Sequence, residues 1–254
     1  MPESHFEMIT PVDRSDYRNL VAPVTDAVWP EFMLHDPVSN EYWDSLFMDF
    51  AEYQFALLIR EHGAVALANS APLYWTEPVE ALPDDGWDWA LVKSAADYSA
   101  DLTPTVLCGL QISVAPDFQG HGLSRIMLTS MVDLARRKGL SAVVIPVRPS
   151  FKSQYPLTPI DRYIQWQRDD GLPFDPWLRV HVRNGGRIVK SCSEAMKIRG
   201  SVGEWEEWTG MRFFDSGDYI VPGALTPVRI DLEQDSGLYV EPNVWVVHQA
   251  SVSA

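Results

Sequence analysis

A turn near the middle of the chain carries the residues best suited to hold a ligand. It runs from Gln119 to Arg125 with the sequence QGHGLSR, after an apolar run that ends Val114-Ala115-Pro116. The first amides of a helix have no partner inside the helix, and the helix dipole makes that end positive. Gly120 and Gly122 lack the Cβ atoms that would keep a bulky anion away from the backbone. The turn therefore predicts a site for phosphate groups.

The segments on either side of this turn differ in periodicity. Residues 105–114 read as a strand, and residues 124–137 read as an amphipathic helix with Met127, Met131 and Leu134 on one face. The helix is expected to end at Arg136-Arg137-Lys138-Gly139, because cations followed by glycine suit the last turn. A wholly apolar run at 142–145 is typical of a strand covered on both faces. Strand, helix and strand predict a βαβ unit with a right-handed crossover.

Two common nucleotide-binding loops do not fit the turn. The ATP and GTP loop requires a lysine directly after its last glycine, and Leu123 follows Gly122. The dinucleotide loop requires a third glycine where this chain has Arg125. What remains is Gln119-x-x-Gly122-x-Ser124, preceded by Val114-x-Pro116.

This pattern resembles the coenzyme A-binding motif of the GNAT N-acyltransferase superfamily, which is Q/R-x-x-G-x-G/A after a strand that ends V-x-P. Ser124 stands where the family prefers glycine or alanine, and serine is small enough to fit. The resemblance covers about residues 5–210. It implies an α/β fold with a mixed central β-sheet flanked by helices, and an acetyl-CoA-dependent N-acetyltransferase.

The resemblance also implies which residues bind acetyl-CoA, which serves as a co-substrate. The phosphates would lie on the turn, and the pantetheine arm would bond to the backbone at the end of the preceding strand. The implied turn residues are Gln119, Gly120, His121, Gly122, Leu123, Ser124 and Arg125, and the implied strand residues are Ile112, Ser113 and Val114. A backbone N–H in that strand would stabilise the developing oxyanion.

The acid–base residues are harder to identify. Many family members place a tyrosine one helical turn before the glycine that ends their last core helix, and the corresponding helix here is 177–183. Counting back from Gly185 or Gly186 gives His181 or Val182, so His181 is the candidate general acid or base. His181 also reads as a histidine hydrogen-bonded at a helix end. Tyr155 is the second catalytic candidate, because it lies on the loop that should border the acyl site. The sequence identifies no base for the amine.

Three functions compete. The first is acetyl transfer from acetyl-CoA to a primary amine of a small molecule by direct attack. The second is malonyl-CoA decarboxylation with transfer to a carrier-protein thiol, because GNAT-like loading domains of polyketide synthases carry a histidine on this helix. The third is a non-catalytic acyl-CoA-binding module.

Composition sets the remaining limits. A chain of 254 residues that is 46% hydrophobic predicts a single domain over 1–254. The GNAT resemblance implies that residues 76–104, 147–175 and 214–254 exceed the family core, as loop insertions at 76–104 and 147–175 and a C-terminal β extension at 214–254. A net charge of −15 disfavours a nucleic-acid partner. The chain has no apolar run of about 20 residues and no export signal, so no membrane association and a cytoplasmic location are expected. Cys108 and Cys192 match no metal spacing, no catalytic metal is expected, and a homodimer is left open.

The remaining elements follow from local patterns. Spacing predicts one amphipathic helix over 40–53, then a hairpin of strands at 55–59 and 64–75. Residues 76–104 read as irregular, with a short helix near 87–93, and are expected to form an insertion or lid. Further strands are expected at 187–196, 197–205, 219–221 and 244–248.

Overall fold

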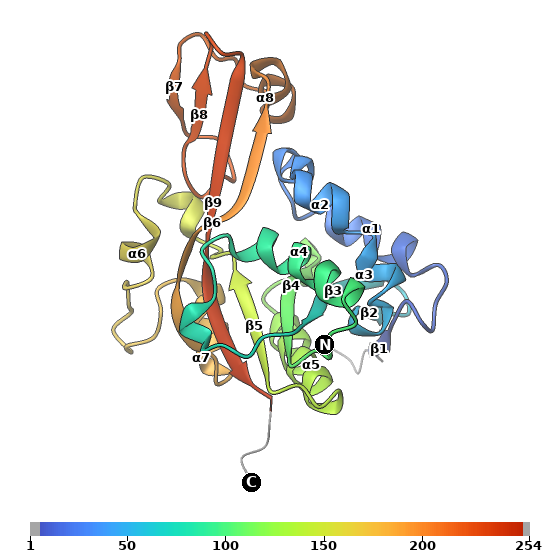
Figure 1. Ribbon diagram of the computed structural model, residues 1–254. Helices are drawn as coiled ribbons and strands as arrows, with labels where there is room; N and C mark the ends of the chain where they lie inside the picture. Colours follow the sequence, from blue (N-terminus) through green and yellow to red (C-terminus); the bar gives the residue numbers. More distant parts are fainter. Residues whose placement is uncertain (1–5, 251–254) are drawn as a thin grey trace.

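A mixed nine-stranded sheet forms the centre of the molecule (Figure 1), and the computed structural model describes residues 6–250. The strand order is β1-β2-β3-β4-β5-β9-β8-β7, with β6 paired to β9. The strands are β1 Phe6–Ile9, β2 Phe55–Ile59, β3 Gly63–Leu73, β4 Val106–Val114, β5 Ala142–Val147, β6 Arg187–Gly200, β7 Gly217–Tyr219, β8 Val228–Asp231 and β9 Ser236–Gln249. The fold class predicted from the sequence is confirmed.

Helices cover both faces of this sheet. Leu67 of β3 packs into a cluster with α1, whereas Gly109 of β4, which pairs with Ser70, faces Met131 of α5. Leu67 and Ser70 are three positions apart on β3, and side chains alternate along a strand, so these two residues face opposite sides of the sheet. The helices that they face, α1 and α5, therefore lie on opposite faces. The α-helices are α1 Tyr17–Asp26, α2 Pro37–Tyr42, α3 Ser45–Met48, α4 Gly86–Ser99, α5 Leu123–Arg137, α6 Ile160–Tyr163, α7 Pro176–Arg183 and α8 Val202–Thr209. The 3₁₀ turns are η1 Glu31–His35, η2 Ala51–Tyr53, η3 Val79–Ala81, η4 Pro116–Phe118 and η5 Lys152–Gln154.

The sheet opens between β4 and β5. These two strands run parallel, with α5 between them in the chain, as the βαβ prediction requires. They pair at Leu107–Val143 and Cys108–Val144, and beyond that point β5 continues to pair with β9. In β4 the register against β3 shifts so that Leu110 is an extra, bulged residue. The strands therefore diverge into a V just past Cys108.

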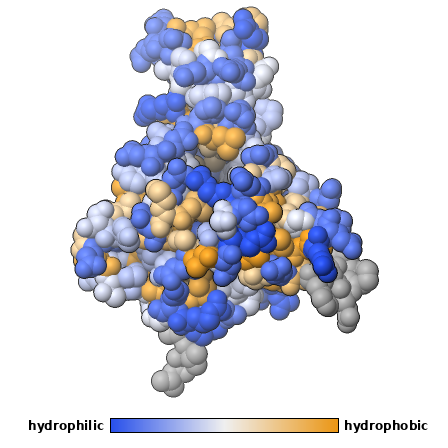
Figure 2. All heavy atoms as spheres, turned by 90° about the vertical axis from the view of Figure 1, so that its right-hand side faces the viewer, coloured by the Kyte–Doolittle hydropathy of each residue, from blue (hydrophilic) through white to orange (hydrophobic). Residues whose placement is uncertain are grey.

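The C-terminal part of the chain builds an arm that projects from the body (Figures 1 and 2). β7, β8, α8 and the adjoining ends of β6 and β9 form it. β9 starts in this arm, pairs with β8, and then runs into the central sheet, where it pairs with β5 over 244–249. The C-terminal β extension expected from the sequence thus ends as a strand of the core.

The single helix predicted over 40–53 is wrong. The segment forms α2, α3 and η2 as separate short pieces. The break falls at Ser45, whose hydroxyl donates to the carbonyl of Tyr42 at 2.7 Å and so competes with helical bonding. Trp43 stacks on Trp87 of α4, whereas Phe47 packs on Tyr17 of α1, so the aromatic residues face two different partners.

The irregular insertion or lid expected at 76–104 is also wrong, although the short helix expected near 87–93 is present as part of a longer one. Residues 86–99 form the 14-residue helix α4, which packs against β3 and β6, and its Ala90 and Leu91 are fully buried. A Cβ on Gly86 would lie 2.9 Å from Cys192 Sγ, so glycine permits the close approach of the helix start to β6. The segment Asp84-Asp85-Gly86 looks like a loop in the sequence, but it leads into a core helix.

The strands predicted at 187–196 and 197–205 are in fact one strand, β6, followed by α8. Ser201 accepts a hydrogen bond from the Glu204 amide, and the Glu204 carboxylate accepts one from the Ser201 amide. This capping box ends the strand and starts the helix. Two further elements, β8 and α1, were not predicted from the sequence.

Candidate active site

A cavity of about 470 Å³ occupies the V between β4 and β5. Residues 109–113 of β4 and 145–148 of β5 line its sheet side. Its opposite wall comes from the end of α1, from η1, and from the segment that holds α2 and α3. Trp87 of α4, Trp177 of α7, and Glu241 and Asn243 of β9 complete it. Elements from the whole length of the chain therefore meet at the point where the sheet opens.

Polar side chains of β3 and β4 form an ordered row beside the cavity. Asn69 Nδ2 donates to Gln111 Oε1 at 2.8 Å, and Gln111 Nε2 donates to Ser113 Oγ at 2.9 Å. Both donor–acceptor steps run towards Ser113, so its hydroxyl proton remains available to a ligand. At the bulge, the Leu110 carbonyl accepts from Trp87 Nε1 at 2.9 Å, which ties α4 to the strand.

The turn after β4 has the geometry of an anion site. Gly120 and Gly122 have φ angles of +77° and +79°, which favour glycine, and Gly122 is the N-cap of α5. No atom lies within 4 Å of the place that a Cβ would occupy on either residue. The amides of residues 120–124 donate no hydrogen bond within the described chain, whereas the Arg125 amide donates to the Gly122 carbonyl at 3.1 Å. A phosphate group fits this open turn.

The side chains of the turn have separate roles. Gln119 Nε2 donates to the Val114 carbonyl at 3.2 Å and so braces the turn against the strand. Leu123 is buried in the core, whereas His121 and Arg125 are exposed. Ser124 is half-buried. Two of the three residues implied on the strand, Ile112 and Ser113, line the cavity, but Val114 does not.

His181 lies behind the cavity wall. Its side chain is fully buried, and its Nδ1 lies 2.9 Å from Nε2 of His248, while its Nε2 has no partner within residues 6–250. Burial lowers the pKa of His181 well below its usual value, and the neighbouring His248 adds to this effect. Trp177, one helical turn earlier, lines the cavity with its ring centroid 4.3 Å from that of His181.

α7, which carries these two residues, begins at a well-defined cap. Asp175 accepts hydrogen bonds from the amides of Trp177 and Leu178 at 2.9 and 3.1 Å, and Pro176 occupies the first helical position. Asp175 also accepts from the Tyr163 hydroxyl at 2.8 Å. The start of α7 is thereby fixed against the preceding loop.

Tyr155 belongs to an aromatic cluster outside the cavity lining. Its ring lies 4.9 Å from that of Trp166, 5.8 Å from that of Phe174 and 6.1 Å from that of Tyr163. The structure thus brings Ile112 and Ser113 to the cavity, and it places Tyr155 and His181 in the layer outside its lining.

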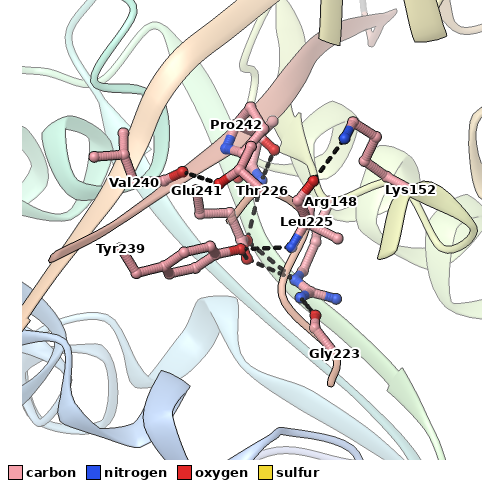
Figure 3. A network of polar contacts seen from close by, with 10 residues as sticks. Arg148, Lys152, Gly223, Leu225, Thr226, Tyr239, Val240, Glu241 and Pro242 are labelled. Carbon is pink, nitrogen blue, oxygen red and sulfur yellow. Dashed lines mark hydrogen bonds and ion pairs between the residues drawn. The ribbon is translucent and has the colours of Figure 1, made fainter. Parts of the chain in front are cut away.

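A charged network closes the cavity on the β9 side (Figure 3). Arg148 Nε lies 3.0 Å from both carboxylate oxygens of Glu241, and its Nη2 donates to the Gly223 carbonyl at 2.6 Å. The Tyr239 hydroxyl and Asn243 Nδ2 also donate to Glu241, at 2.9 and 3.2 Å. The Glu241 side chain thus accepts hydrogen bonds from three residues, and Glu241 also lines the cavity.

Lys152 fastens the loop beside this network (Figure 3). The side chain is buried, and its ammonium donates to the carbonyls of Tyr155 and Leu225 at 2.9 and 2.6 Å. Burial lowers the pKa of Lys152 to about 8. The lysine therefore acts as a cross-link between two backbone segments.

Two further carboxylates lie beneath the cavity wall. Asp36, the N-cap of α2, is fully buried, and Asp88 lies in the first turn of α4. Oδ1 of each has no hydrogen-bond partner within residues 6–250. Burial raises the pKa of Asp36 to about 6, and burial together with the charge of Asp36 raises that of Asp88 to about 8. At pH 7 Asp88 therefore holds a proton.

We expect Asp88→Asn to stabilise the protein most at alkaline pH. Both folded-state pKa values lie above the reference value of 3.8, so the folded protein loses stability as the pH rises from about 4 to about 8. Asparagine removes one ionisable group, so the variant should gain about 1–3 kcal/mol at pH 9 and little at pH 5. Thermal unfolding across this range, with the exposed Asp169→Asn as a control, measures the effect. Parallel pH curves for Asp88→Asn and the wild type would contradict it.

Tryptophans form the apolar part of the cavity wall. Trp29, Trp43, Trp87 and Trp177 all line it, and the rings of Trp43 and Trp87 stack 5.9 Å apart. The Arg148 guanidinium lies 5.7 Å from the Trp29 ring centroid. Aromatic faces attract cations and flat groups. Asp44, which pairs with Arg18 at 2.7 Å, adds a carboxylate to the same wall.

The sheet and the site together match the arrangement that the GNAT resemblance implies. Two strands part around a cavity, and one of them leads into a glycine turn with free amides at a helix N-terminus.

Within residues 6–250 no cluster of three or more His, Cys, Asp or Glu residues could hold a metal ion. The same part of the chain contains no helix with the length and apolar character needed to cross a bilayer.

Sequence comparison agrees with the GNAT resemblance. The chain is 34% identical over 249 residues to the arginine N-acetyltransferase avaD of Aspergillus versicolor, covering 87% of this chain and 85% of that protein. No protein-family model matches the chain. The chain belongs to the GNAT N-acyltransferase superfamily, as the turn motif indicated. It is an enzyme that transfers an acyl group from an acyl-CoA to an amine of a small molecule.

Solved structures share the fold. The loading GNATL domain of CurA from Lyngbya majuscula superposes with a TM-score of 0.64 at 19% identity, covering 97% of this chain and 98% of that one. The GphF GNAT-like decarboxylase, solved in complex with isobutyryl-CoA, gives a TM-score of 0.57 at 16% identity, with 97% and 100% covered.

Several groups at the site were not found from the sequence. They are Trp29, Trp43, Asp44, Arg148, Trp177 and Glu241. None of them belongs to a local motif. The one signal available for Glu241 was an acidic residue within the largely apolar segment 238–248. A charge buried in a strand is costly unless it has a partner, so a partner for Glu241 could have been expected.

Proposed function

We propose that the acceptor is a cationic nitrogen compound of the arginine type and that the acyl donor is acetyl-CoA. Support for the acceptor comes from the cavity, where Asp44 and Glu241 place carboxylates beside tryptophan rings. A guanidinium ion can stack on an aromatic face while its N–H groups bond to a carboxylate. The sequence relative is itself named as an arginine N-acetyltransferase.

For the donor, we propose that the amides of residues 120–124 hold the phosphates and that Arg125 and His121 supply positive charge at the edge of the turn. The pantetheine arm would then run along β4 past Val114, Ser113 and Ile112. This route leads to the bulge at Leu110, which lies beside the cavity. A backbone N–H at this end of the strand would stabilise the oxyanion, a contribution of about 2.7–4 kcal/mol in other enzymes.

The reaction that follows is direct attack. The acceptor nitrogen forms a bond to the thioester carbon, the C–S bond breaks, and the thiolate leaves as coenzyme A. The nitrogen gives up one proton, which needs an acceptor. We propose His181, which is neutral because its pKa is lowered, as the group that takes this proton. Because His181 lies behind Trp177 and outside the cavity lining, the proton would have to pass through an intervening group. Tyr155 remains the second acid–base proposal. A cytoplasmic location and a homodimer also remain sequence-based proposals.

The test is release of free coenzyme A from acetyl-CoA with a panel of acceptors. Arginine, agmatine and lysine should each support release, with arginine or agmatine the best, while a neutral amine of equal size should be poor. Asp44→Asn should raise KM for the cationic acceptors by about tenfold, a loss of one charge-assisted hydrogen bond. Equal rates with neutral and cationic amines would contradict the proposed acceptor class. Carbon dioxide release from malonyl-CoA without an amine would instead indicate decarboxylase activity.

The same assay, run across pH, tests His181. His181→Gln keeps a polar side chain but removes the titratable group, so kcat should fall and its acidic limb should flatten. His248→Gln serves as the matched control, because it changes the partner of His181 and leaves His181 itself in place. Undiminished turnover of His181→Gln at every pH would exclude an acid–base role.

A further inference from the structure

Three residues, Gly109, Met131 and Ile145, meet at the apex of the V between β4 and β5. A Cβ added to Gly109 would lie 2.7 Å from Met131 Sδ and 3.0 Å from Ile145 Cγ1. Gly109 and Ile145 directly follow Cys108 and Val144, the last residues that pair across the two strands. Gly109, Met131 and Ile145 all line the cavity. The apex is therefore closed by one methionine and one isoleucine packed over a glycine.

We propose that Met131 and Ile145 form the end wall of the acyl site and restrict the donor to short acyl chains. The inference rests on the proposed path of the pantetheine arm along β4, which brings the thioester to the bulge at Leu110. Leu110 is adjacent to Gly109, so an acyl group at the bulge points into the apex. Met131 is fully buried and Ile145 is 8% exposed, so both side chains are held within the core where they border the cavity.

The composition of this wall suits a length filter. Gly109 adds no side chain, and Met131 and Ile145 pack so closely over it that not even a Cβ fits between them. Met131 and Ile145 then fill the space that a third or fourth acyl carbon would need. One methylene in an apolar pocket changes kcat/KM by about 10- to 200-fold. Shortening either side chain should therefore move the preference towards longer chains.

The experiment compares kcat/KM for acetyl-, propionyl- and butyryl-CoA, with the best amine that the wild-type enzyme accepts. Met131→Ala should raise the ratio of butyryl-CoA to acetyl-CoA by about tenfold or more. Ile145→Val, which removes one methyl group, should raise the propionyl ratio by a smaller factor. Met127→Ala is the matched control, because Met127 lies one turn earlier on α5 and is equally buried but does not line the cavity. Its ratios should equal those of the wild type.

Unchanged ratios in Met131→Ala and Ile145→Val, with thermal unfolding showing both to be folded, would overturn the proposal. If Met131→Ala fails to fold, Ile145→Val alone decides, because it is the smaller change. A shift of equal size in Met127→Ala would also overturn it, since the effect would then come from general loosening of the core. Failure of the proposed acceptor class would look different. Cationic and neutral amines would then be acetylated equally, while the ratios between acyl donors would still change in Met131→Ala.

Discussion

Gly122→Trp should abolish binding of acyl-CoA. Gly122 has a φ of +79°, which residues with a side chain rarely adopt, and no atom lies within 4 Å of the place that a Cβ would occupy. Tryptophan would place an indole over the free amides of residues 120–124, where we propose that the phosphates lie. Calorimetric titration with coenzyme A should show no heat of binding, which corresponds to a loss of at least 100-fold in affinity, or about 2.7 kcal/mol.

Gly139→Trp separates this effect from backbone strain. Gly139 follows the other end of α5, has a φ of +72°, and also has no atom within 4 Å of the place that a Cβ would occupy. Both variants carry the same conformational cost of about 1–2 kcal/mol for a side chain in the left-handed region. Gly139→Trp should bind coenzyme A normally. Normal binding by Gly122→Trp would remove the turn from the donor site.

Glu241→Gln should reduce both stability and acceptor binding. Glu241 is 1% exposed and Arg148 is 23% exposed, so the variant leaves a largely buried guanidinium without its counter-charge. Breaking a buried ion pair in this way costs about 3–5 kcal/mol. For a chain of this size we expect a fall in Tm of roughly 6–12 °C. KM for a cationic acceptor should rise by about tenfold at temperatures where the variant is folded.

An exposed ion pair in the projecting arm, between β7 and β8, provides the comparison. Arg229 and Asp218 lie 3.2 Å apart with side chains that are 67% and 59% exposed. Asp218→Asn should change stability by less than about 1 kcal/mol and leave KM unaltered. If Glu241→Gln were as mild as Asp218→Asn, Glu241 would have no special part in the fold or the site. A lower Tm with an unchanged KM would confine its role to the fold.

The sequence predicted those features that depend on neighbouring residues. The turn at 119–125 could be found because a strand, two glycines and a helix start stand in one short segment. The helix that carries His181 was predicted from its end, because Asn184-Gly185-Gly186 closes it, whereas its start at Asp175-Pro176 was not recognised. Ser201 and Glu204 have the spacing of a capping box, which indicates a helix start, but residues 197–205 were predicted as a strand.

The acceptor side of the cavity could not be predicted in this way. Arg148 and Glu241 are 93 positions apart and meet only because β5 and β9 pair. Trp43 seemed to belong to the apolar face of one helix, and the break at Ser45 turns it towards Trp87 instead. Such convergence depends on strand order, which no single segment encodes. Its chemistry becomes visible only in the folded chain.

The tryptophan wall has a practical consequence. The chain has ten tryptophans, and four of them line the cavity. Indole emission depends on the polarity around the ring, and a ligand that displaces water from this cavity changes that polarity for all four rings together. The protein therefore carries its own optical reporter, and occupancy of the cavity can be followed in unlabelled protein.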